Sequence, residues 1–308
     1  MPDGADRRSR VYGALMPDIH LHSSGGATAR IAPELGFCCL SWCVGGVEHV
    51  RLPVPEDVFR SDAKTGGIPL LYPFANRLRA DPFGAHPWVK RDDNDLPIHG
   101  CLLRFSDWTN LEVEGDRAAV TLEWGLHPEL IKLFPYPHTL RVEYVLEDRS
   151  IRVNTQVFAN GGCDVPASFG WHPYLCLPDV EDTVLSLETP QLEHVQLDEQ
   201  CLPVRDDSGD LVVMGPADLD GPLMGRTFDD LYRRADSRTI FALAGGGKTV
   251  RLHAAAPWHF IQVYHPPGAD FVAIEPMMAP AAALSDRSDL PLVKSGEVLD
   301  ATFELSVE

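Results

Sequence analysis

Apolar and polar residues alternate with a period of two over many short stretches of this chain. From Leu140 to Leu146 every second residue is apolar, and the alternation resumes from Ile151 to Val157. The polar segment Glu147 to Ser150 separates the two runs. Alternation of this kind places one face of an extended strand on a core, and the polar segment is typical of a turn. The pattern predicts a strand, a turn and a second strand.

The same alternation recurs towards the end of the chain, whereas long amphipathic helices are missing from the pattern. Further strands are predicted at Arg251–His253, Phe260–Tyr264, Phe271–Ile274 and Thr302–Val307. Only Pro128–Leu133 and Ala281–Ser285 suit a helix, each of a turn or two. Many strands without crossover helices favour an all-β fold, a large sandwich of antiparallel sheets. With no evident linker, we expect one domain over residues 1–308, with residues 1–15 as a flexible N-terminal extension.

One segment resembles a phosphate-binding loop but occurs in the wrong setting. Ala242 to Thr249 ends in Gly-Lys-Thr, as that loop does. Phosphate binding there needs a helix directly after the loop, whose N-terminal amides hold the phosphates. Here the next residues alternate like a strand up to Pro257. We therefore expect the three glycines to form a hairpin turn.

Net charge limits the possible partners. The chain has 26 basic and 45 acidic residues, a formal charge of −19. Nucleic acids and anionic membranes are held mainly by Lys and Arg, so both are unexpected partners. We expect a small-molecule substrate and a monomer or homodimer.

Cysteine use and the terminal sequence indicate the compartment. The seven cysteines are odd in number, lie mostly in apolar segments and form no Cys-x-x-Cys pair. This is typical of buried free thiols in a reducing cytoplasm. No apolar run approaches the roughly 20 residues that cross a bilayer, and the polar N-terminus lacks a secretory signal.

Four segments place polar, functional side chains in apolar surroundings. They are Gly66–Leu78 with Asn76 and Arg77, Pro97–Arg104 with His99, Phe169–Tyr174 with His172, and Phe271–Met277 with Glu275. Taken singly, Arg77 also suits a surface ion pair and His99 a structural turn histidine. Glu275 has no nearby Lys or Arg in the sequence, which weakens a structural salt bridge and favours a general base.

The absence of other motifs narrows the chemistry. The chain has no Gly-x-Ser-x-Gly nucleophile turn and no His-Glu-x-x-His zinc motif. His20 and His22 share one strand face without a nearby third ligand, so we interpret them as a surface pair. One imidazole and one carboxylate can exchange protons with a substrate in both directions. We therefore expect proton transfer with no cofactor and no metal.

At these residues the sequence resembles the aldose 1-epimerase, or galactose mutarotase, family. The resemblance runs in chain order from about Gly36 to the C-terminus. It rests on five pieces: Pro73–Leu78, His99-Gly100, Gly170–Tyr174, Phe228–Tyr232 and Ala273–Pro276. It implies a large antiparallel β-sandwich and a cofactor-independent isomerase that interconverts the α and β anomers of a free hexose or related aldose.

The resemblance also implies roles for individual residues. Glu275 would take the proton from the anomeric hydroxyl O1, and His172 would give a proton to the ring oxygen O5. His99 would polarise the ring oxygen. The substrate hydroxyls would be held by Arg77, Asn76 and Asp229, with Asp230 as the alternative to Asp229 because the two are adjacent.

Two other functions remain open. A hexose 6-phosphate epimerase would need cations at the rim of the site, for which Arg79, Arg91 and Arg104 are the candidates. A non-catalytic carbohydrate-binding protein on the same fold is the other alternative. In that case Glu275 and His172 would not share a cavity.

Overall fold

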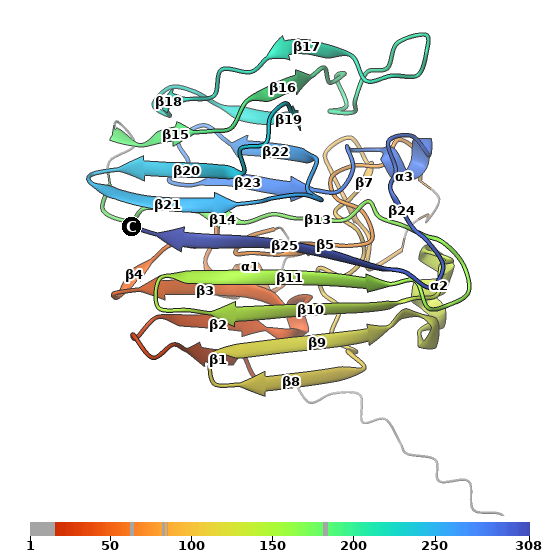
Figure 1. The fold of residues 1–308 in the computed structure, drawn as a ribbon, viewed down its shortest axis with the longest axis horizontal. Coiled ribbons are helices and arrows are strands. Elements are labelled where there is room, and N and C mark those ends of the chain that lie inside the picture. Colours follow the sequence, from red (N-terminus) through yellow and green to blue (C-terminus); the bar gives the residue numbers. More distant parts are fainter. Residues whose placement is uncertain (1–15, 62–64, 82–83, 85, 181–183) are drawn as a thin grey trace, which may run out of the picture.

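Two large antiparallel sheets contain most of the strands (Figure 1). A computed structural model of the chain describes residues 16–61, 65–81, 84, 86–180 and 184–308. The predicted all-β antiparallel fold is confirmed. The predicted N-terminal extension, residues 1–15, lies outside the described residues.

The larger sheet has nine strands, all paired antiparallel. Their order is β18 (Gly221–Pro222), β15 (Ser186–Glu188), β20 (Ile240–Gly245), β21 (Lys248–His253), β25 (Val298–Val307), β11 (Ser150–Phe158), β10 (Thr139–Leu146), β9 (Arg117–Glu123) and β8 (Asn110–Glu114). The predicted hairpin is β10–β11, with Leu140 opposite Val157. The glycine-rich segment forms the β20–β21 hairpin as predicted, with Gly246 and Gly247 in the left-handed region at φ of 56° and 76°.

The second sheet carries the residues of interest. Its path is β17 (Val213–Pro216), β16 (Leu192–Val195), β19 (Phe228–Arg234), β22 (Phe260–His265), β23 (Val272–Met277), β13 (Gly170–Trp171) and β5 (Leu70–Leu71). Strand β14 (Tyr174–Leu175) also pairs with β23.

Smaller elements complete the fold. The small sheets are β1–β4 (Ile19–His22, Thr28–Ala32, Cys38–Val44, Val47–Glu48), β6–β7 (Lys90–Arg91, Pro97–Ile98) and β12–β24 (Val165–Pro166, Leu292–Val293). The helices are α1 (Glu56–Ser61), α2 (Pro128–Leu133) and α3 (Ala283–Asp286), with 3-10 turns at Pro33–Leu35 and Trp124–Leu126. Helix α2 has its predicted bounds, α3 begins two residues later than predicted, and α1 was not predicted. No helix in the described ranges is long and apolar enough to cross a membrane.

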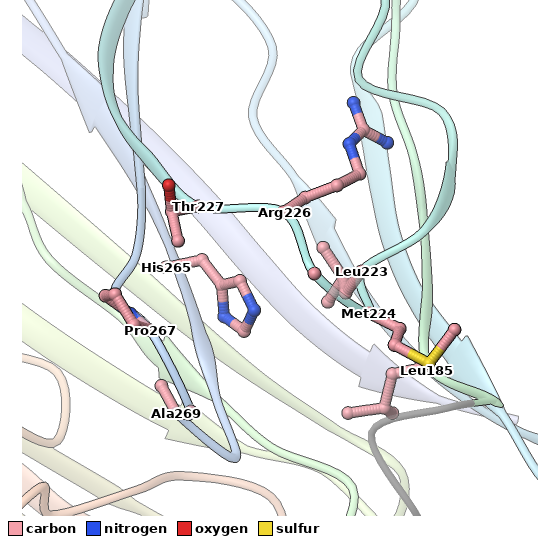
Figure 2. Close-up of a pocket in the computed structure, with 10 residues that line it drawn as sticks. Leu185, Leu223, Met224, Arg226, Thr227, His265, Pro267 and Ala269 are labelled. Atoms are coloured by element: carbon pink, nitrogen blue, oxygen red, sulfur yellow. The ribbon is translucent and has the colours of Figure 1, made fainter.

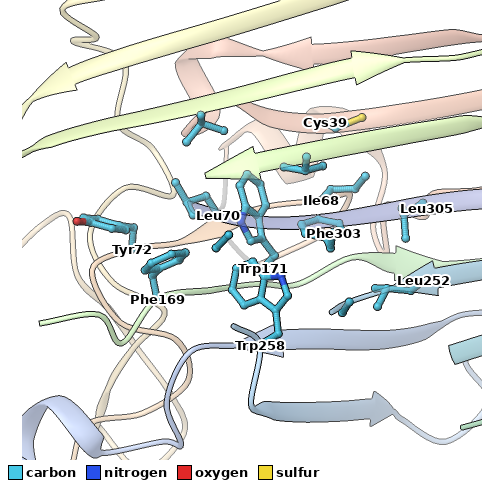
Figure 3. Close-up of a cluster of buried hydrophobic side chains, with 14 of the residues drawn as sticks. Cys39, Ile68, Leu70, Tyr72, Phe169, Trp171, Leu252, Trp258, Phe303 and Leu305 are labelled. Carbon is cyan, nitrogen blue, oxygen red and sulfur yellow. The ribbon is translucent and has the colours of Figure 1, made fainter. Parts of the chain in front are cut away.

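A shared apolar core lies between the sheets (Figure 3). Its centre contains two tryptophans, Trp171 and Trp258, both fully buried. Their indole N–H groups donate hydrogen bonds to Thr155 Oγ1 (3.0 Å) and to the Thr302 carbonyl (2.8 Å). Burial of an indole is less costly when its N–H finds such an acceptor. These two hydrogen bonds therefore allow large rings to fill the centre of the core.

Strands β22 and β23 are covered on both faces. Ile261, Val263 and Ile274 point into the core between the sheets. Side chains alternate along a strand, so Gln262, between Ile261 and Val263, and Glu275, next to Ile274, point to the opposite face. Polar groups are thereby buried on the side of the sheet that faces away from the core.

Replacement of Trp258 by alanine tests how much this core contributes to the free energy of unfolding. Trp258→Ala should lower the free energy of unfolding by about 3–5 kcal/mol, because it opens a large cavity and leaves the Thr302 carbonyl without its donor. Urea unfolding followed by circular dichroism measures this change. Val298→Ala, at a side chain that is half exposed on β25, is the matched control and should change stability by less than about 0.5 kcal/mol. Equal effects of the two substitutions would contradict this account of the core.

Candidate active site

A buried glutamate and a buried histidine meet at the centre of the second sheet. Glu275 lies on β23, and His172 follows β13, the strand that pairs with β23. Glu275 Oε1 lies 3.0 Å from His172 Nε2, and both side chains are at most 5% exposed. The structure thus brings together two groups that are about a hundred residues apart in the sequence.

Burial controls the protonation of this pair. Desolvation, and then the nearby Asp229, raise the pKa of Glu275 well above its usual value, although Arg77 opposes the shift. Desolvation, and then His99, lower the pKa of His172 well below its usual value. Both shifts favour the uncharged forms, so the pair carries one proton, on Glu275, over a wide pH range.

Tyr174 fixes the orientation of the His172 ring. The two rings are stacked with centroids 4.5 Å apart and planes 7° apart. The Tyr174 hydroxyl is in turn hydrogen-bonded to Thr65 Oγ1 at 2.7 Å. The ring of Phe271 also packs against Tyr174, with the ring centroids 5.0 Å apart. His172 therefore has little freedom to turn away from Glu275.

Two loop segments bring Asn76 and His99 to the same place. Both residues adopt left-handed backbone conformations, with φ of 55° and 63°, and the His99 amide donates to the Asn76 carbonyl at 3.0 Å. Gly100 follows with φ of 72°, where a Cβ would lie 2.1 Å from the Tyr72 carbonyl oxygen. Only glycine fits so close an approach, which explains the His-Gly pair in the sequence.

His99 lies beside His172 and stays neutral. Its ring centroid is 5.5 Å from that of His172, with the planes at 80°. Burial, and then the Arg77 guanidinium, lower the pKa of His99 to about 3. At neutral pH this imidazole can therefore both donate and accept a hydrogen bond.

Arg77 is held in place by two neighbours. Its Nε donates to Asp92 Oδ2 at 2.6 Å, and one terminal nitrogen donates to Asn76 Oδ1 at 3.0 Å. The other terminal nitrogen lies 3.9 Å from Asp229 Oδ2. The guanidinium is thus oriented with donors left for a ligand.

Alternation along β19 separates Asp229 from Asp230. Asp229 points to the same face as Glu275 and accepts a 2.8 Å hydrogen bond from Gln262 Nε2. Gln262 is directly opposite Glu275 in the strand register. Asp230 points to the other face and pairs with His194. Of the two adjacent carboxylates, only Asp229 belongs to this site.

The side chains that surround Glu275 and His172 line one cavity of about 630 Å³, here called the main cavity. Its wall includes each of the six residues singled out in the sequence: Asn76, Arg77, His99, His172, Asp229 and Glu275. The volume is within the roughly 300–1,000 Å³ of small-molecule sites.

Several buried polar atoms of the main cavity have no partner among the described residues. They are His99 Nδ1, His172 Nδ1, Gln262 Oε1 and Glu275 Oε2. Unpaired buried polar atoms are unfavourable, and in native proteins they call for a specific explanation. Their grouping here fits a ligand that carries several hydroxyl groups.

Sequence reasoning missed three residues of the wall or its support. Gln262 and Tyr264 lie on a strand that was predicted, and their alternation with Ile261 and Val263 could have marked them as facing away from the core. Asp92 gave no signal, because it lies in a loop without a distinctive motif. It lines the main cavity and holds Arg77 in place.

Two of the three arginines considered for phosphate binding lie elsewhere. Arg79 binds Asp286 and the Pro203 carbonyl, and Arg104 binds the Phe59 carbonyl and packs over the Phe59 ring. Arg91 lines the main cavity beside Lys90, but its guanidinium is bound to Asp81 and to the Asp95 carbonyl. Within the described ranges, no three His, Cys, Asp or Glu side chains are grouped to hold a metal ion.

Comparison with known proteins identifies the family. The family model described as aldose 1-epimerase matches residues 17–306, nearly the whole chain. The chain belongs to the aldose 1-epimerase family. The family consists of isomerases, and this places the chain among them. The search of curated proteins found no significant match.

Solved structures agree with this assignment at low sequence identity. A galactose mutarotase-like protein from Clostridium acetobutylicum has a TM-score of 0.77 and 18% identity, covering 94% of this chain and 95% of that one. Galactose 1-epimerase from Lactobacillus acidophilus has a TM-score of 0.70 and 17% identity, covering 94% of each chain. An aldose epimerase homologue from C. elegans has a TM-score of 0.69 and 15% identity, covering 95% and 98%. These likenesses establish a common fold.

The opposite orientations of Asp229 and Asp230 lead to a paired test. Asp229→Asn should lower kcat/KM for aldose epimerisation roughly 10–100-fold, because a hydrogen bond to a charged group contributes about 1.5–3 kcal/mol. Asp230→Asn changes the next residue on the opposite face and should stay within about twofold of the parent. Anomer exchange measured by NMR on both variants is the experiment. A larger loss in Asp230→Asn would mean that the wrong carboxylate has been assigned to the site.

Proposed function

We propose that the chain is a mutarotase, an aldose 1-epimerase that acts on a free hexose or a related aldose without a cofactor. The single observation that supports this most is the 3.0 Å approach of buried Glu275 Oε1 to His172 Nε2 in a sugar-sized cavity. A base and an acid in direct contact can remove one proton from a hemiacetal and return another.

The reaction begins from the ionised form of the pair, which burial disfavours, with Glu275 as carboxylate and His172 as imidazolium. Glu275 takes the proton of the O1 hydroxyl, the O1 electrons form a carbonyl at C1, and the C1–O5 bond breaks. His172 gives its proton to O5. The sugar is then an open-chain aldehyde, and the pair has become an uncharged acid and an uncharged imidazole.

Reclosure reverses these steps on the other face of the carbonyl. Rotation about the C1–C2 bond presents that face to O5, His172 removes the O5 proton, and Glu275 returns a proton to O1. Burial favours the uncharged pair that accompanies the open chain. The site thereby offsets part of the cost of holding the less stable open form.

The other wall residues hold the sugar. His99, neutral beside His172, donates to the ring oxygen and polarises it. Arg77, Asn76 and Asp229 bind hydroxyl groups, and the unpaired Oε1 of Gln262 accepts one more. A phosphorylated hexose has less support, because Arg79 and Arg104 do not line the main cavity and Arg91 is already bound to a carboxylate.

Removing the base tests the mechanism directly. Glu275→Gln preserves size and should lower kcat roughly 10²–10⁴-fold, the usual contribution of a general base. Polarimetry on freshly dissolved sugars measures this, after subtraction of spontaneous mutarotation. Glu199→Gln, at an exposed glutamate, is the matched control and should keep the parent rate. A Glu275→Gln variant as fast as the parent would rule out this mechanism and favour a non-catalytic carbohydrate-binding role.

The pKa shifts also predict the shape of the pH profile. Activity needs one proton on the pair, so it falls at low pH when His172 takes up a second proton and at high pH when Glu275 loses the last one. Since burial lowers the pKa of His172 and raises that of Glu275, the acid limb should lie below 6.5 and the alkaline limb above 4.5, with a broad plateau between them.

The measurement is kcat/KM against pH, corrected for spontaneous mutarotation. A rate that rises through pH 4.5 and then stays level would be the profile of an exposed carboxylate acting alone. That result would contradict the coupled, buried pair.

A further inference from the structure

Strand β19 also faces a second cavity, on the side opposite to the main cavity. Phe228, Asp230 and Tyr232 alternate with Asp229 and therefore share the other face of the strand. With His194 of β16 they line a cavity of about 330 Å³ near the edge of the sheet, here called the edge cavity. Its volume is at the lower end of the range for small-molecule sites.

Three polar side chains of the edge cavity are linked to one another. His194 Nε2 donates to Asp230 Oδ1 at 3.2 Å. His194 is directly opposite Tyr232 in the strand register, and their ring centroids are 5.1 Å apart. Tyr232 is only 3% exposed, and burial, followed by the neighbouring Asp230, raises the pKa of its hydroxyl. His194, Asp230 and Tyr232 thus form a polar cluster that is held together by their own contacts, on the inward face of the sheet.

The wall opposite this cluster is held in place by Arg226. Its guanidinium donates to the carbonyls of Asp218, Leu219 and Asp220 at 2.7–3.2 Å, and it lies 4.8 Å over the Phe228 ring. Figure 2 shows the adjoining hollow around His265, with the Arg226 side chain extending away from it. The edge cavity is therefore preformed, and Arg226 is engaged with backbone carbonyls.

The chemistry of the wall selects a class of ligand. Among the described residues the edge cavity is lined by no lysine or arginine, whereas Asp218 and Asp230 both contribute, so an anion would be repelled. With Nε2 committed to Asp230, His194 keeps Nδ1 as an acceptor, and the Asp230 carboxylate, which also interacts with the Tyr232 hydroxyl, has lone pairs left to accept from a ligand. Separate acceptors beside the rings of Tyr232 and Phe228 suit hydroxyl donors on a ring with an apolar face.

We infer that the edge cavity is a second binding site for a neutral sugar, formed by His194, Asp230 and Tyr232. The site is separate from the proposed catalytic pair and does not depend on its activity. Asp229 and Asp230, adjacent on β19, would then each serve a different carbohydrate site on opposite faces of one strand.

The test is an NMR titration of the full chain with D-galactose and D-glucose, observing the His194 imidazole. This signal is assigned by its loss in a His194→Gln variant. Sugar should shift the His194 resonances in the parent and equally in Arg77→Ala, which weakens binding in the main cavity. Asp230→Ala should raise the dissociation constant for this shift roughly tenfold or more, and Tyr232→Phe should raise it less.

Controls separate loss of binding from loss of structure. Asp230→Ala should keep the unfolding midpoint and the epimerase rate of the parent. If Asp230→Ala lowers the unfolding midpoint, the more conservative Tyr232→Phe variant is used for the binding test instead. Two results would overturn the inference. The first is that the His194 resonances do not shift at sugar concentrations that saturate the main cavity. The second is that they shift with butylamine but with neither of the two sugars. If the chain has no epimerase activity but the His194 resonances still shift with sugar, the proposed function is wrong and the second site is supported.

Discussion

The burial of a carboxylate next to an imidazole is the constraint on which the rest of the site depends. A charged group removed from water is costly unless a partner compensates it, and here each group is the other's partner. The low exposure that makes the pair costly also shifts both pKa values towards the uncharged forms. The same burial therefore sets both the stability problem and the chemistry of the pair.

The sheet solves this problem by separating its two faces. Along β22 and β23 one set of alternating side chains fills the core, and the other set lines the main cavity. The core residues anchor the strands rigidly, so Glu275 and Gln262 are held in register without contributing to the core themselves. The same alternation directs Asp229 and Asp230 to different cavities, which gives neighbouring residues unrelated surroundings.

Irregular backbone supplies the parts of the site that strands cannot. Asn76 and His99 sit in left-handed conformations, which most residues adopt only at a cost, and a backbone hydrogen bond joins them. Gly100 allows that segment to approach Tyr72 closely. The Tyr174 ring then holds His172 from the side. Contacts with the neighbouring sheet offset the cost of these left-handed loop conformations.

The sequence by itself determined the strands, the antiparallel class and the residues with unusual surroundings, because these depend on local alternation and on neighbours in the chain. The β10–β11 hairpin and the glycine turn of β20–β21 needed no tertiary information. The tertiary structure alone decided that Glu275 touches His172, that Asp229 and not Asp230 faces them, and that Gln262 and Asp92 belong to the site. Those facts depend on which strands pair and in which register, and distant segments of a chain carry no local record of that pairing.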